Sequence, residues 1–98
     1  MGLQMAQAVH AAFGFAQAHP ATTASWLRDS QFIVVVSVPD EAALLTLSLD
    51  AGARGVDTVL WREPDQNDEA TALALAPVPE AMKLCSSLPL AGKAMTKV

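Results

Sequence analysis

Apolar residues recur at intervals of three to four along the first part of the chain. The members of this series are Leu3, Ala6, Val9, Phe13 and Ala16. The spacing is that of one face of an amphipathic helix, which we place over residues 3–18. We expect this helix to end before Pro20, because the residue preceding a proline is disfavoured in the helical conformation. A second, short helix is predicted over residues 22–30, with the hydroxyl of Thr22 or Thr23 as its N-cap.

The pattern beyond this point is that of strands alternating with helices. Residues 31–38 read QFIVVVSV, which is apolar on both faces and predicts a central strand covered by helices on each side. A helix is expected to begin at Asp40 and to end at Gly52 or Gly55. The remaining predicted elements are a strand VDTVLW (56–61), a strand TALALA (71–76) and a helix VPEAMKLCSSL (78–88).

This order of elements predicts an α/β fold, a three-layer α/β/α sandwich with a small mixed sheet. The 98 residues, 52% of them hydrophobic, suffice for one core, so residues 1–98 are expected to form a single domain. A helix that opens such a fold usually follows a strand, and the predicted sheet leaves room for one more. We therefore expect the first strand of the fold, which would precede Gly2, to be missing from this chain.

The sequence also bears on the compartment. No apolar run approaches the roughly 18 residues of a membrane-spanning helix, and the N-terminal stretch lacks the basic region of a signal peptide. Cys85 is the single cysteine and cannot form a disulfide within the chain, so we predict a buried structural thiol in a reducing compartment. The expectation is a soluble, cytoplasmic protein with no membrane partner.

Candidate chemistry is sparse. The chain contains none of the motifs CxxC, HExxH, GxSxG, GxGxxG or the P-loop, which argues against the common metal, acyl-transfer and nucleotide sites. Gln7 and His10 are three residues apart and share a helix face. Glu63 and Asp65 lie two apart in an acidic loop, where an extended chain would point both carboxylates the same way. Thr71 stands at the head of the third predicted strand.

Each candidate also has a purely structural interpretation. His10 could be a core histidine with its hydrogen bonds satisfied, and Gln7 could cap an edge of the sheet. The acidic loop has the composition of a solvated segment, and Thr71 is an ordinary strand residue. The residues by themselves therefore predict a small α/β domain with a polar site where the first helix meets the acidic loop.

A resemblance to a known family extends this prediction. The stretch GLQMAQAVHAAF resembles the first-helix motif of the type 2 peptidyl-tRNA hydrolases, roughly G-K-x-A-A-Q-x-x-H-A, with five residues in register: Gly2, Ala6, Gln7, His10 and Ala11. FIVVVSVPDEAALLTL resembles the central strand of the family and the start of its next helix. GVDTVLWREPD and TALALAPVPEAMKLCSSLPL resemble the last two strands and the closing helix, and REPD with TALAL is most similar to a bacterial branch.

The resemblance implies hydrolysis of the ester that joins a peptide to the terminal ribose of tRNA, a reaction that rescues tRNA from stalled ribosomes. It implies peptidyl-tRNA as the partner, and neither a metal nor an organic cofactor. By position, Glu63 or Asp65 takes the place of the family's catalytic acid and Thr71 that of one of its threonines. Gln7 and His10 would line the helix side of the site and bind substrate.

Two features depart from the family. Leu3 stands where the family has a lysine, and the net charge of −4 is unlike the basic surface that usually neutralises tRNA phosphates. The family's first strand and the basic turn after it are expected to lie upstream of Met1. Three hypotheses follow: a peptidyl-tRNA hydrolase or a part of one, a non-catalytic binding module of the same fold, and an open domain that forms a homodimer or otherwise self-associates through an unpaired sheet edge.

Overall fold

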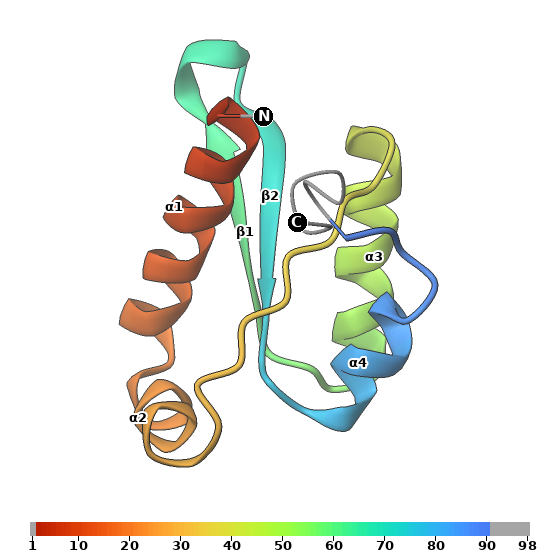
Figure 1. Ribbon diagram of the computed structural model, residues 1–98. Helices are drawn as coiled ribbons and strands as arrows, with labels where there is room; N and C mark the ends of the chain where they lie inside the picture. Colours follow the sequence, from red (N-terminus) through yellow and green to blue (C-terminus); the bar gives the residue numbers. More distant parts are fainter. Residues whose placement is uncertain (1, 91–98) are drawn as a thin grey trace, which may run out of the picture.

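The computed structural model describes the backbone of residues 2–90 and the side chains of residues 6–90. It shows a small α/β fold, in which a β-hairpin lies between α1 on one face and α3 on the other (Figure 1). No helix within residues 2–90 is both long and apolar enough to cross a membrane. The elements are α1 (Gly2–Ala18), α2 (Pro20–Asp29), α3 (Glu41–Ala53), β1 (Thr58–Glu63), the 3₁₀ turn η1 (Pro64–Gln66), β2 (Glu69–Leu75) and α4 (Pro79–Cys85).

Helix α1 covers the range predicted for it, but it buries a different face. Gln7, Ala11 and Phe15 point inward at intervals of four, whereas Val9 is 51% and Phe13 is 74% exposed. The predicted stripe is therefore not the buried one. The reason is that α1 is apolar around most of its circumference, so periodicity does not select a face. Contact with the sheet selects it instead.

Helix α2 begins earlier than predicted. Pro20 occupies its first turn and His19 stands at the N-cap position, without a capping bond from its side chain. The expectation that Thr22 or Thr23 caps the helix is wrong, because Pro20 is pre-organised for the first helical position. Thr23 lies inside the helix, where its Oγ1 donates a hydrogen bond to the carbonyl of His19 at 2.9 Å.

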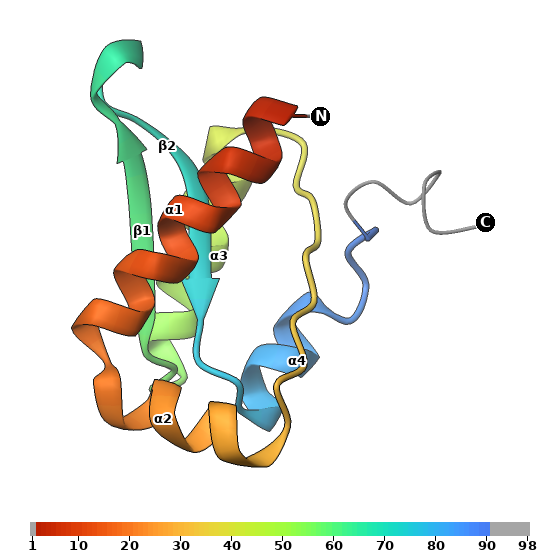
Figure 2. The ribbon, with the colours of Figure 1, turned by 60° about the vertical axis from the view of Figure 1, so that its left-hand side comes forward.

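The segment 31–38 does not form the predicted central strand. Its only contacts of strand type in the described chain are a single bridge between Val36 and Leu90 and a hydrogen bond from Ser37 N–H to the Pro89 carbonyl at 2.9 Å. Figure 2 shows the segment separated from β2, on the side away from β1. A strand requires a hydrogen-bonded neighbour, and the described residues supply no ladder here. Its apolar side chains are consequently open to solvent, with exposures of 80% for Phe32, 69% for Ile33 and 68% for Val34.

The sheet consists of β1 and β2, paired antiparallel, rather than the mixed sheet that was predicted. Both predicted strands exist, displaced by about two residues toward the loop that joins them. The pairing shifts by one residue: Trp61 faces Ala72 whereas Arg62 faces Ala70, which makes Thr71 the extra residue of a β-bulge. Bulges bend a strand and redirect a side chain, and they are common beside active sites.

The core is built from small residues around one aromatic ring. Phe15 packs with a cluster drawn from α3, the two strands and α4, whose buried members are Ala51, Val56, Ala76 and Ala81. Gly14 allows α1 to approach β1 closely, since a Cβ at this position would lie 3.3 Å from Cγ1 of Val59. Cys85 is only partly buried, and burial raises the pKa of its thiol.

Helix α3 begins and ends as its sequence predicts. Asp40 is the N-cap, and its Oδ1 accepts a hydrogen bond from the Ala43 N–H at 2.8 Å. The helix ends at Ala53, and Gly55 adopts the left-handed conformation with φ of 73°. This geometry brings the Val56 N–H to the Ala51 carbonyl at 2.9 Å and leads the chain into β1.

Candidate active site

Gln7 connects the first helix to the end of β1. It is only 5% exposed and is the one buried polar residue among those whose side chains are described. Its Nε2 donates a hydrogen bond of 2.8 Å to Oε2 of Glu63. An amide side chain that is buried and bonded to a carboxylate fixes the position of that carboxylate. The predicted meeting of the first helix and the acidic loop is thus present, through these two residues.

The surroundings of Glu63 keep it ionised. The hydrogen bond from Gln7 is the main cause that lowers the pKa of Glu63, while partial burial opposes it. The backbone N–H of Asp65, the indole of Trp61 and the charge of His10 lower the pKa further. A carboxylate held in this way accepts hydrogen bonds at neutral pH, which is the property needed to orient a water molecule.

His10 lies one turn beyond Gln7 and stacks on Trp61, with ring centroids 4.7 Å apart and an angle of 10° between the planes. His10 is exposed, so it is not the satisfied core histidine of the structural interpretation. The buried Nε1 of Trp61 has no hydrogen-bond partner among the described residues. The N–H dipole of the indole still favours the neighbouring Glu63 carboxylate.

Asp65 is placed differently from Glu63. The chain turns into η1 directly after Glu63, so the two residues do not lie on the extended segment that would point both carboxylates the same way. Asp65 is exposed, and within the described chain its side chain makes no hydrogen bond or ion pair. Of the two acids, Glu63 is therefore the one that α1 positions.

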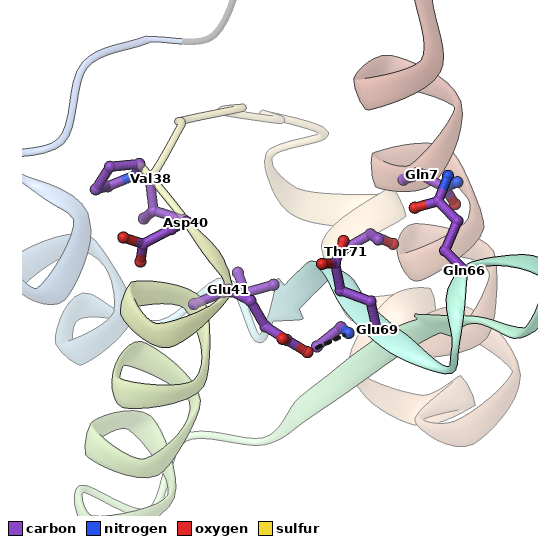
Figure 3. Close-up of a pocket in the computed structure, with 10 residues that line it drawn as sticks. Gln7, Val38, Asp40, Glu41, Gln66, Glu69 and Thr71 are labelled. Carbon is purple, nitrogen blue, oxygen red and sulfur yellow. Dashed lines mark hydrogen bonds between the residues drawn. The ribbon is translucent and has the colours of Figure 1, made fainter.

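Thr71 lines a cavity of about 270 Å³ between α1, β2 and the start of α3 (Figure 3). Gln7 borders the same cavity from the α1 side, and Glu41 borders it from the α3 side. Thr71 Oγ1 and Gln7 Oε1 are both buried and lack a hydrogen-bond partner in the described structure. Two unpartnered buried polar atoms beside an open cavity are suited to binding a polar ligand.

Glu41 was not predicted as part of the site. Its Oε2 accepts a hydrogen bond of 2.8 Å from the backbone N–H of Ala70, next to Thr71. This bond ties the first turn of α3 to β2 at the bulge. Trp61 was also missed, although it precedes Glu63 by two residues and therefore shares its side of β1. Nothing local in the sequence distinguishes these two from ordinary surface and core residues.

The cavity is acidic. Its charged lining residues are Asp40, Glu41 and Glu69, and no lysine or arginine borders it among the described side chains. Within that part of the chain, Arg54 and Lys83 pair with Glu80 instead. Leu3, which stands at the position of the family's lysine, belongs to α1. The described residues contain no cluster of three or more histidine, cysteine or acidic side chains that could hold a metal ion.

The fold and this site together define a small α/β domain with a carboxylate held by a buried amide at the mouth of a polar cavity. The family model described as "Peptidyl-tRNA hydrolase PTH2" matches residues 1–88. The chain therefore belongs to the PTH2 peptidyl-tRNA hydrolase family. No curated protein matches it closely enough to count as a relative.

Proposed function

We propose that this chain hydrolyses the ester between a peptide and the terminal ribose of tRNA, in the manner of a bacterial member of the family. The observation that carries the proposal is the 2.8 Å hydrogen bond by which buried Gln7 holds the Glu63 carboxylate. Family membership supports the substrate, and the polar cavity beside Gln7 and Thr71 supports the location.

Glu63 acts in this proposal on the attacking water. Its carboxylate accepts a hydrogen bond from the water, whose oxygen attacks the ester carbonyl carbon, and the water proton passes to the ribose oxygen as the carbon–oxygen bond breaks. Because the pKa of Glu63 is lowered, its main contribution is to orient the water rather than to retain the proton. The Thr71 hydroxyl, which has no other partner in the described structure, donates a hydrogen bond to the developing oxyanion.

The acidic cavity favours a second candidate, in which the chain binds its ligand without hydrolysing it. No described cation borders the cavity to offset negative charge on the ester. We therefore expect hydrolysis by the 98-residue chain to be slow or absent, and its measurement requires single-turnover conditions with the protein in excess over an N-acetylated aminoacyl-tRNA.

Four variants separate the candidates: Glu63→Gln, Glu63→Ala, Thr71→Val and, as the matched control, Asp65→Asn. We expect both Glu63 variants to lower the rate at least about tenfold, the usual scale for a positioned acid or base, and Asp65→Asn to leave it within about twofold. Loss of rate in Asp65→Asn with full rate in Glu63→Gln would assign the acid to Asp65. A rate no faster than the spontaneous one, with binding retained, would establish the non-catalytic candidate.

We also propose that an additional strand completes the sheet along the free edge of β2, as the family resemblance implies. The separation of β2 from residues 31–38 and the exposure of Phe32, Ile33 and Val34 support this. Without such a strand, the unpaired edge is a template for pairing with another chain. The 98-residue chain is then expected to form a homodimer or to associate further in solution.

A further inference from the structure

The aromatic pair beside the site presents a flat, open surface. Trp61 covers one face of the His10 imidazole, and His10 is nevertheless exposed, so its opposite face is open to solvent. The pair is isolated: the other ring contact in the described chain, between Phe15 and His19, is tilted by 36° and includes the buried core residue Phe15. Only the His10–Trp61 pair therefore offers a nearly parallel column that a further ring can extend.

This surface lies close to the proposed acid. His10 is three residues from Gln7, which places their Cβ atoms about 5–6 Å apart on α1. Trp61 is two residues from Glu63, so their Cβ atoms are separated by roughly 7 Å along β1. The column is therefore about one nucleoside away from the carboxylate that Gln7 holds.

We propose that the base of the terminal nucleotide of tRNA stacks on the open face of His10. The inference rests on the proposed function, because the same ribose then carries the ester at Glu63 and the base at His10. Stacking on aromatic side chains is a general means of holding single-stranded ends of RNA. It needs no basic surface, which suits a chain with a net charge of −4.

The competing explanation is that the pair only fastens α1 to β1. A second is that an aromatic side chain of the peptide, rather than the base, occupies His10. The three explanations differ in what they require: the first requires no ligand, the second depends on the peptide, and our proposal depends on the terminal base alone.

The test uses the binding of deacylated acceptor-stem hairpins, so that it does not depend on hydrolysis. One hairpin ends in adenosine and the other in an abasic ribose. A Trp26→Phe background leaves Trp61 as the single tryptophan, whose fluorescence reports on the column. We expect the abasic end to bind about tenfold more weakly and to quench Trp61 less.

Variants of His10 complete the test. His10→Ala should bind both hairpins equally, and His10→Phe should restore the preference for adenosine, because it restores a flat ring. His19→Ala, at the other histidine, should keep the preference. Equal binding of the two hairpins by the Trp26→Phe protein, or no binding of either, would overturn the proposal.

A final arm separates the base from the peptide and from the reaction itself. Substrates acylated with N-acetylalanine and N-acetylphenylalanine should show the same loss of apparent affinity in His10→Ala; a loss confined to the phenylalanine ester would assign His10 to the peptide. Glu63→Gln should retain the preference for adenosine. If base-dependent binding persists while no hydrolysis is measured, the stacking proposal stands and the proposed function fails.

Discussion

Replacement of Glu41 by alanine should destabilise the fold far more than the loss of an ordinary surface carboxylate. Glu41 begins α3 and accepts the hydrogen bond of the Ala70 N–H at 2.8 Å. Ala70 is only 3% exposed, so the variant leaves a buried backbone donor without a partner. The first turn of α3 also loses its single acidic residue.

The magnitude follows from these two losses. A buried unsatisfied donor costs about 1–3 kcal/mol, and a carboxylate at a helix N-terminus contributes about 0.3–1 kcal/mol. We therefore expect Glu41→Ala to lower the free energy of unfolding by about 2–3 kcal/mol, out of the roughly 5–15 kcal/mol typical of a domain. For a chain of this length, that corresponds to a fall in Tm of about 10–20 °C.

Two further variants isolate the causes. Glu41→Gln keeps an acceptor oxygen but removes the charge, and should cost only about 0.5–1 kcal/mol. Glu80→Ala is the control, because Glu80 makes partly exposed ion pairs with Arg54 and Lys83, and such pairs contribute about 0–1 kcal/mol. Urea titration followed by circular dichroism measures all three. A cost for Glu41→Ala no greater than that of Glu80→Ala would show that the bond to Ala70 does not anchor α3.

Three other predictions concern the site, the core and the open edge. Gln7→Met removes the donor that lowers the pKa of Glu63, so the acid limb of the pH–rate profile, or of a Glu63 titration by NMR, should move up from below 4.5 toward that value; the stabilisation by this pair is full above pH 4.5 and is lost as the pH falls through the folded-state pKa, and an unchanged limb would refute the assignment. Phe15→Ala should cost about 3–5 kcal/mol in urea unfolding and Phe13→Ala at most about 0.5 kcal/mol, since their exposures are 8% and 74%; similar costs would mean that α1 buries another face. Ile33→Lys should reduce self-association in analytical ultracentrifugation, whereas Leu49→Lys on α3 should not, and a monomeric unsubstituted chain would contradict the role of the open edge.

Local sequence determined the elements whose signals are complete within a few residues. The helix start at Asp40 and the left-handed Gly55 after α3 were both predictable, because a cap and a glycine act through bonds to their own neighbours. The resemblance around Gln7 and His10 also indicated where the site lies. Whether Glu63 or Asp65 is the acid was not decided by sequence, because both are carboxylates in the same loop.

Tertiary structure decided the features that depend on distant partners. The inward face of α1 is set by contact with the hairpin, because nearly every face of that helix is apolar. The 3₁₀ turn after Glu63 directs one carboxylate to Gln7 and leaves the other exposed. The bulge at Thr71 arises from the register of two strands, and the bond from Ala70 to Glu41 joins residues 29 apart. Residues 31–38 have the composition of a strand, but a strand exists only where another backbone is present to pair with it.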